Sequence, residues 1–272
     1  MSEEMQNPIL ESKPVKKRRV KKLPDDFIIL DENILEVIQP VTAPEVIQPV
    51  TAPVIQTEDL GKIFEMGVCM VYGIPYVGKY KYSMEEAEKL RDRLKLLLHI
   101  FPHELTHTAK NGSQYDFTGA TNEMIKLSAK TTKKDGKVAP QVIGQPSRKK
   151  FCNIFGIDCS ASLEEIKSYI EANASLMLEK YFDTTFDCPI LYYNQHKDVL
   201  QFIRLINKVD WSSQSIQFTR KGTIWNESSS IKIGKITIGE FQVHNNRDCI
   251  KFRWSFENLL KMFKESFEIT SL

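Results

Sequence analysis

The sequence lacks the features that mark secreted, membrane-spanning and zinc-ribbon proteins. Its five cysteines are dispersed, odd in number and never spaced as CxxC, which excludes a disulfide framework and a zinc knuckle. No apolar run is long enough to span a bilayer, and the N-terminus is too acidic and polar for a secretory signal. The net charge of only +2 indicates no class of partner by itself. We therefore expect a soluble intracellular protein, long enough to bury a sizeable core.

The N-terminal part lacks the periodicity of a folded domain. Residues Lys13–Lys22 read KPVKKRRVKK, a basic cluster that is similar to a nuclear localisation signal and that could also contact nucleic acid. Residues Val37–Gln56 give one unit about twice, with a proline every four or five residues, which favours an extended linker. The sequence predicts a disordered leader over 1–57 and one folded domain over 58–272.

Helical and strand-like periodicities follow each other in the remaining residues, which predicts a mixed α/β domain. Ser83 and Glu86 form a predicted capping box, and Asn245-Asn246 forms a predicted two-residue hairpin turn with a bulge at Gly239-Glu240. Helices are expected over 58–74, 83–101, 147–156, 162–182, 197–209 and 257–263. Strands are expected over 113–120, 124–132, 137–145 and 188–195, and over most of 211–256.

Residues 103–107 read HELTH, the pattern of zinc-protease helices. On a helix the two histidines share one face and can bind zinc while the glutamate acts as a general base. Here Pro102 precedes the motif, and Lys110 and Ser113 occupy the positions of the glycine and third histidine of the longer zinc-protease pattern. A short polar turn leading into the next strand is the preferred interpretation, and a zinc hydrolase remains the weaker alternative.

A second candidate metal site follows in the strands predicted over 113–120 and 124–132. Phosphodiester hydrolysis needs a divalent metal and a cation near the reacting phosphate. Ser128 and Lys130 share one face of their strand, because alternate side chains point the same way. Asp116 and the backbone carbonyl of Ala129 offer the oxygen ligands that Mg²⁺ prefers. The alternative is a turn-capping aspartate beside a solvated lysine.

On these residues the sequence resembles the PD-(D/E)xK nuclease superfamily, and within it the type II restriction endonucleases. LGKIFEMGV resembles the family's first helix, whose glutamate, here Glu65, often assists metal binding. YDFTG resembles the aspartate strand, LSAKTTKKDGKVAPQVIGQ the lysine strand and its continuation, and IGEFQVHNNRDCIKFRW a late hairpin used near DNA. The chain departs from the family at Tyr115, where proline is usual, and at Ser128, where a second acidic residue is usual. Candidates to replace that acid are Glu65, then Glu123, then Glu104.

Basic and amide side chains concentrate in two places that can contact DNA. Eight Lys or Arg and a single Asp lie between Lys126 and Lys150. In the late hairpin, alternation places Gln, His, Lys and Arg opposite an apolar face, where they can reach base edges or phosphates. A solvated polar surface is the alternative. The residues expected at DNA are Gln141, Gln145, Arg148, Lys149, Gln242, His244, Arg247, Lys251 and Arg253.

The resemblance implies a restriction-endonuclease-like mixed β-sheet flanked by helices, and a sequence-specific double-stranded DNA endonuclease that uses Mg²⁺. It implies that Asp116, Glu65 and the Ala129 carbonyl bind the metal and that Lys130 activates water, with Ser128 in the same site. A homodimer and a cognate DNA methyltransferase are further implied partners. The basic leader would suit work in a eukaryotic cell, for example by a protein of a large DNA virus. The main alternative is an inactive DNA-binding module of the same fold, since serine is a poor magnesium ligand.

Overall fold

The computed structural model describes residues 57–110, 113–134, 136–141, 143–220 and 225–272. All of them belong to one compact unit, residues 52–272. The basic cluster Lys13–Lys22 and residues 1–56 of the expected disordered leader lie outside the described residues, whereas Thr57, its last residue, begins a helix. No described helix combines the length and the apolar character that a membrane span requires.

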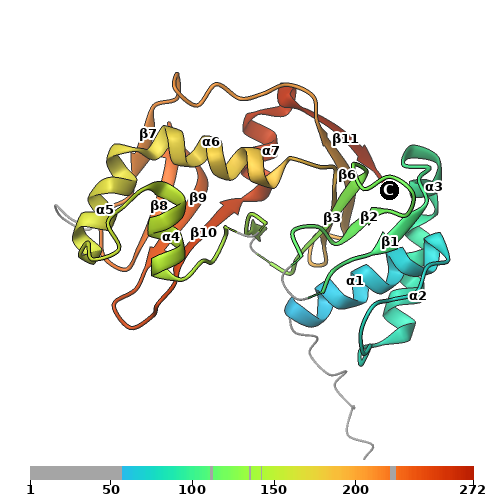
Figure 1. Cartoon of the computed structure of the whole chain (residues 1–272). Helices are drawn as coiled ribbons and strands as arrows, with labels where there is room; N and C mark the ends of the chain where they lie inside the picture. The colour runs from blue at the N-terminus through green and yellow to red at the C-terminus, as the bar shows by residue number, and fades with distance from the viewer. Residues whose placement is uncertain (1–56, 111–112, 135, 142, 221–224) are drawn as a thin grey trace, which may run out of the picture. The chain divides into compact units, whose positions relative to one another are not determined.

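Helices and strands are interspersed along the chain, which confirms the mixed α/β class (Figure 1). The helices are α1 Thr57–Tyr72, α2 Met84–Arg93, α3 Leu97–Ile100, α4 Arg148–Phe155, α5 Leu163–Ala172, α6 Ala174–Thr185 and α7 Phe256–Met262, with 3-10 turns at Leu94–Leu96 and Lys264–Ser266. The strands are β1 Leu105–His107, β2 Phe117–Gly119, β3 Lys126–Thr132, β4 Lys137–Val138, β5 Ile190–Asn194, β6 Val199–Leu205, β7 Ile216–Phe218, β8 Ser228–Ile233, β9 Ile236–Val243, β10 Ile250–Ser255 and β11 Phe267–Ser271.

The strands form two sheets. The first is six-stranded in the order β1-β2-β3-β5-β6-β11, and its β3–β5 pair is parallel. The second is five-stranded and antiparallel, in the order β4-β10-β9-β8-β7. Sheets flanked by helices are consistent with the restriction-endonuclease-like architecture that the sequence implies.

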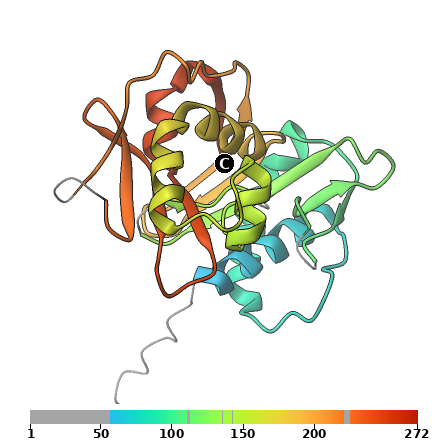
Figure 2. The same cartoon turned by 60° about the vertical axis from the view of Figure 1, so that its left-hand side comes forward.

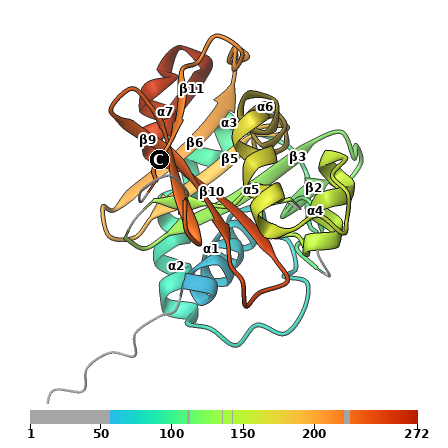
Figure 3. The same cartoon turned by 90° about the vertical axis from the view of Figure 1, so that its left-hand side faces the viewer.

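Helices cover both faces of the first sheet (Figure 3). On one face α1 and α2 pack against the sheet through residues such as Phe64 and Leu127. On the other face Tyr192 joins a larger core that includes α6 and the apolar side of the second sheet. Figure 2 shows α4 to α6, in yellow-green and yellow, beside the red strands of that second sheet.

Burial on both faces explains why one prediction was wrong. Residues 197–209 read as a helix, but Val199–Leu205 form strand β6. Leu200 and Phe202 enter one core while Ile203 enters the other. A strand covered on both faces is apolar at odd and even positions alike, and such a run cannot be told from a helix by periodicity alone.

Other expected elements are confirmed with shifted ends. The helix predicted over 162–182 is broken at Asn173 into α5 and α6. The strand predicted over 137–145 is limited to the two residues of β4. The expected bulge lies slightly earlier: Ile231 pairs with Gly239 and Lys232 with Thr237, which leaves Ile238 as the extra residue.

Gly119 at the end of β2 lets the chain turn tightly into β3. A Cβ atom there would lie 2.3 Å from the Asn122 carbonyl oxygen, so backbone would have to move. We expect Gly119→Ala to lower the free energy of unfolding by about 1–3 kcal/mol, because strain in a packed turn is not relieved by rotating a side chain. Urea denaturation measures this.

The matched control is Gly61→Ala in helix α1. An added Cβ at Gly61 would meet only Thr131 Oγ1, at the ordinary contact distance of 3.7 Å. Alanine also has the higher helix propensity, so this variant should be as stable as the wild type or up to about 1 kcal/mol more stable. Equal destabilisation by both variants would contradict the tight turn at Gly119.

Candidate active site

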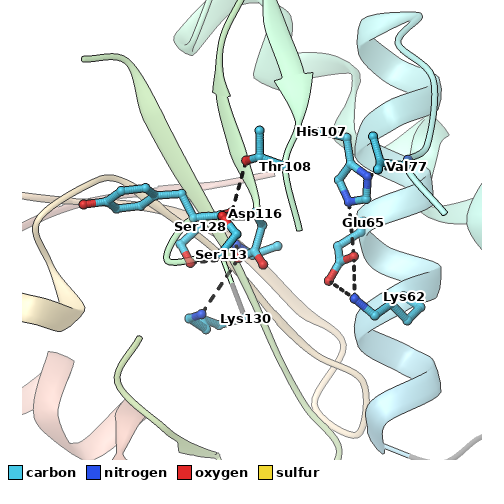
Figure 4. A network of polar contacts seen from close by, with 11 residues as sticks. Lys62, Glu65, Val77, His107, Thr108, Ser113, Asp116, Ser128 and Lys130 are labelled. Carbon is cyan, nitrogen blue, oxygen red and sulfur yellow. Dashed lines mark hydrogen bonds and ion pairs between the residues drawn. The ribbon is translucent and has the colours of Figure 1, made fainter. Parts of the chain in front are cut away.

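The β2–β3 hairpin brings Asp116 beside the lysine strand. Asp116 immediately precedes β2, and Phe117 pairs with Leu127, so the Asp116 side chain lies level with Ser128. Its Oδ2 atom accepts hydrogen bonds from the Ser128 hydroxyl at 2.9 Å and from the Ala129 N–H at 2.7 Å. The Lys130 ammonium lies 3.9 Å from the same oxygen (Figure 4). The structure therefore brings together all four residues that the sequence placed in this hairpin.

Strand β1 holds Asp116 from the other side. The Thr108 N–H, just beyond β1, donates to the Asp116 carbonyl at 2.9 Å. The Thr108 hydroxyl donates to the Tyr115 carbonyl at 3.1 Å. Backbone and side chain together thus fix the approach of the chain to Asp116, which limits the movement of its carboxylate.

The Ala129 carbonyl is directed toward the same side of β3 as Asp116. The Ser128 N–H donates to Pro189, on the β5 side, whereas the Ala129 N–H donates to the Asp116 carboxylate. The N–H and C=O of one residue point to the same edge of a strand, and successive residues alternate. The Ala129 carbonyl oxygen and the Asp116 carboxylate are therefore both available at one edge of the lysine strand.

Two buried polar residues, Ser128 and Gln141, lie on the protein-interior side of Asp116. Ser128 is fully buried, and Gln141 is 5% exposed. In its alternative amide orientation Gln141 donates to the Thr184 carbonyl at 2.8 Å and to the Thr185 carbonyl at 3.2 Å, and its oxygen lies 2.9 Å from the Ser128 hydroxyl, where it competes with Asp116 for the single hydroxyl hydrogen. The expectation that Gln141 faces the DNA backbone was wrong, because β4 ends at Val138 and the chain turns inward there.

Cys188 also borders the site, between the charges of Asp187, Asp116 and Lys130. Burial raises the pKa of its thiol well above the ordinary value, and Asp187 raises it further. A raised pKa favours the protonated thiol, which is a poor nucleophile and a poor metal ligand.

Glu65 forms a separate cluster on the α1 side (Figure 4). Its carboxylate accepts from Lys62 at 3.0 Å and lies 3.3 Å from His107 Nε2. His107 Nδ1 accepts the Val77 N–H at 2.9 Å, so the ring carries its hydrogen on Nε2 and donates to Glu65. No contact joins Glu65 to Asp116 in the described part of the chain. The structure thus gives Glu65 a partner that the sequence did not predict.

The HELTH stretch is neither a zinc-binding helix nor a turn. Its last three residues form strand β1, which pairs with β2 at the edge of the first sheet. The His107 ring is buried and stacks on Tyr76 with ring centroids 4.5 Å apart. The His103 ring packs on Phe101 instead, at 4.6 Å. Side chains four apart in extended chain are separated by about 13 Å along it, so the two imidazoles do not share a zinc-binding face.

The two histidines should therefore respond differently to mutation. His107→Ala would leave the Glu65 carboxylate without its donor, the Val77 N–H without its acceptor, and a cavity, so we expect a loss of about 3 kcal/mol in unfolding free energy. His103 is half-buried, and His103→Ala should cost less than about 1 kcal/mol. Denaturant titration measures both. Stoichiometric zinc, lost equally in the two variants, would contradict these assignments and restore the zinc hydrolase.

Three side chains of the second sheet converge on Glu240 in β9. Lys137 of β4 donates to it at 2.6 Å and Arg253 of β10 at 3.1 Å, and Gln242 also donates to it. We call Glu240, Lys137, Gln242 and Arg253 the Glu240 cluster. Gln242 and Arg253 were expected at DNA, whereas Glu240 and Lys137 were missed. The opposite charges of Glu240 and Arg253 could have indicated an ion pair between β9 and β10, but only the register of the hairpin shows that these two residues face each other.

That register differs from the predicted two-residue turn. Val243 pairs with Ile250, so Glu240 lies opposite Arg253. A turn at Asn245-Asn246 would have placed Glu240 opposite Lys251 instead. The apolar and polar faces are nevertheless as predicted, because the register differs by two residues and an even shift leaves each side chain on the same face of the sheet.

The other residues expected at DNA differ in how exposed they are and in whether they already have a partner within the protein. His244 lies 3.0 Å from the Glu227 carboxylate. Arg148 is half-buried and donates from Nη2 to the Ala161 carbonyl, and its phosphate contact stays a prediction. Gln145, Lys149 and Arg247 are exposed, and Lys251 is half-buried.

No family model matches this sequence, and no solved structure matches it. The chain is 47% identical over 222 residues to a curated relative, the type II restriction enzyme CviAII of Paramecium bursaria Chlorella virus 1. The similarity covers 80% of this chain and 64% of the viral protein. The chain thus spans a little less than two thirds of the length of that relative.

Proposed function

We propose that this chain is a sequence-specific double-stranded DNA endonuclease of the type II restriction class, and that it hydrolyses phosphodiester bonds with Mg²⁺. The observation that carries the proposal is the convergence of Asp116, the Ala129 carbonyl edge and Lys130 on one hairpin. Identity of 47% to a type II restriction enzyme supports the same activity.

The Asp116 carboxylate and the Ala129 carbonyl are oxygen donors of the kind that magnesium prefers. The described residues contain no group of three or more His, Cys, Asp or Glu side chains placed to bind a metal. Magnesium, however, keeps several waters and is commonly held by one or two carboxylates together with substrate phosphates. Asp116 and the Ala129 carbonyl would hold it here. Glu65 would join them only by giving up Lys62 and His107, so we assign Glu65 to positioning α1 against β1.

The residues of the hairpin divide the work of hydrolysis. When bound, the metal would polarise the scissile phosphate and favour ionisation of a water molecule. Asp116 is held in one orientation by Ser128 and Ala129, so it presents its carboxylate without reorganising. Lys130, with 18% of its side chain exposed, can orient a water and offset negative charge that develops on the phosphate.

Ser128 keeps one alternative open, a DNA-binding module without activity. A fully buried serine replaces the second acid of the resembled family, and the protein's share of metal ligands is small. The two functions differ in a single result, since the inactive module binds DNA without cutting it.

The test is incubation of the purified protein with phage or plasmid DNA of known sequence, with Mg²⁺, with Zn²⁺ and with EDTA. Discrete fragments in Mg²⁺ alone are expected, and sequencing of the fragment ends would define the site. DNA binding by gel shift without cleavage in any metal would leave the inactive module. If the protein neither binds nor cleaves DNA, the proposal is refuted.

Two further parts of the proposal concern assembly and partners. Cutting both strands normally requires two active sites, so we propose a homodimer, which sedimentation on a specific duplex would test. We also propose that a cognate methyltransferase modifies the same DNA sequence. We further propose that this protein acts in the nucleus of an infected eukaryotic cell. Resistance of host-propagated DNA to cleavage would support the methyltransferase.

A further inference from the structure

The Glu240 cluster places a carboxylate at the centre of a basic sheet face. The side chain of Glu240 is only 12% exposed, while Lys137 and Arg253 around it are about one third exposed. The partners come from three different strands, β4, β9 and β10. A surface carboxylate with three donors from three strands is not a loose solvent-exposed ion pair.

The opposite face of these strands is committed to the core. Phe241, Phe252 and Trp254 are fully buried. Because side chains alternate, the residues between them point the other way, and the face that carries Glu240 is polar across the sheet. The polar positions of β8, β9 and β10 on this face include Ser230, Lys232, Glu240, Gln242, Lys251 and Arg253.

Glu240 remains ionised in this setting. Burial, the largest influence, raises the pKa of its carboxyl, but hydrogen bonds from Lys137, Arg253 and Gln242 outweigh burial and leave that pKa below its ordinary value. A fixed negative charge amid the cations of a DNA-binding face repels phosphates and occupies the cations that would bind them. It is therefore unfavourable for indiscriminate DNA binding.

The same carboxylate orders the side chains best suited to reading bases. Arginine can donate two parallel hydrogen bonds to guanine, and glutamine can pair in the same manner with adenine. An anchored side chain loses less conformational freedom on binding. Arg253 reaches Glu240 through Nη2, and its Nε is a buried donor without a partner in the described part of the chain.

We propose that Glu240 is a specificity-determining residue, which positions Arg253 and Gln242 for contact with base edges of duplex DNA and holds Lys137 away from non-specific phosphates. The occupant of this face is double-stranded DNA, because the face carries four cations, of which Lys137 and Arg253 contact Glu240 and Lys232 and Lys251 lie on the neighbouring strand positions. The inference rests on the proposed function and extends it to the choice of sequence. Glu240 acts through its neighbours.

The discriminating variant is Glu240→Gln, which keeps the shape and an acceptor oxygen but removes the charge. Binding of a duplex without the recognition sequence is measured by fluorescence anisotropy in EDTA over a range of salt. Cleavage in Mg²⁺ is measured on the recognition sequence and on sequences with one altered base pair. We expect non-specific binding to tighten about tenfold and the ratio of correct to incorrect cleavage to fall about tenfold or more.

The matched control is Glu268→Gln. Glu268 is also a strand carboxylate paired with an arginine, Arg204 at 3.6 Å, but it lies on β11 of the other sheet. It should change neither quantity. Should Glu240→Gln fail to fold by thermal melting, Arg253→Lys provides a second test, because lysine keeps the charge and loses the bidentate geometry. It should lower the cleavage ratio without tightening non-specific binding.

The outcomes separate the two proposals. If the wild type cleaves specifically and Glu240→Gln changes neither non-specific binding nor the ratio, the role of Glu240 is refuted and the nuclease stands. A uniform loss of cleavage on all sequences would indicate a purely structural role and would also refute it. If the wild type binds DNA but cuts none, the proposed activity fails while the anisotropy arm still decides for or against Glu240. Absence of any DNA binding overturns both.

Discussion

Asp116→Asn is expected to reduce the rate of DNA cleavage at least about a thousandfold, which corresponds to the several kcal/mol that metal-assisted charge stabilisation contributes. Asparagine has nearly the same shape and can still accept the hydrogen bonds from Ser128 and Ala129. It removes the negative charge on which cation binding depends. Single-turnover cleavage of a duplex in saturating Mg²⁺ measures the effect, and DNA affinity in EDTA should fall little or rise, since one negative charge is lost.

Asp198→Asn is the matched control for Asp116→Asn. Asp198 pairs with Arg93 at the surface and has a φ of 52°, a conformation that asparagine tolerates well. Cleavage should stay within about twofold of the wild type. Retention of cleavage by Asp116→Asn in a folded protein would remove the assigned metal ligand and with it the proposed mechanism.

Lys130→Met should give the second largest loss, about 10²–10³-fold in the single-turnover rate, which is typical for removing one donor aimed at developing charge. Methionine preserves most of the aliphatic stem, so packing on β3 should change little. The slope of log affinity against log salt should also fall by about one, because one phosphate contact is lost. Rate and slope together separate a catalytic lysine from one that only binds DNA.

Lys208→Met serves as the control for Lys130→Met. Lys208 is 81% exposed and pairs loosely with Asp183 at 3.8 Å. Neither the rate nor the salt slope should change. A loss confined to the slope in Lys130→Met, with a normal rate at saturation, would show that Lys130 binds DNA without assisting hydrolysis.

Local sequence determined the hairpin at the centre of the proposed site. Strand alternation is set by covalent geometry, so Ser128 and Lys130 had to share a face once residues 126–132 were a strand. The two-strand pattern around the turn placed Asp116 beside them. In the late hairpin the same alternation assigned the apolar and polar faces correctly, although the turn was longer than predicted.

Tertiary structure alone decided which partners these residues meet. Helical periodicity could place Glu65 on α1, but only the packing of α1 beside β1 brings it to His107. HELTH becomes a strand because β1 pairs with β2, and a three-residue strand has almost no intrinsic preference to oppose that pairing. The burial of Gln141 and the ion pair between Lys137 and Glu240 have the same cause. Contacts between residues far apart in sequence depend on register and packing, which follow from burying the whole core and not from any local pattern.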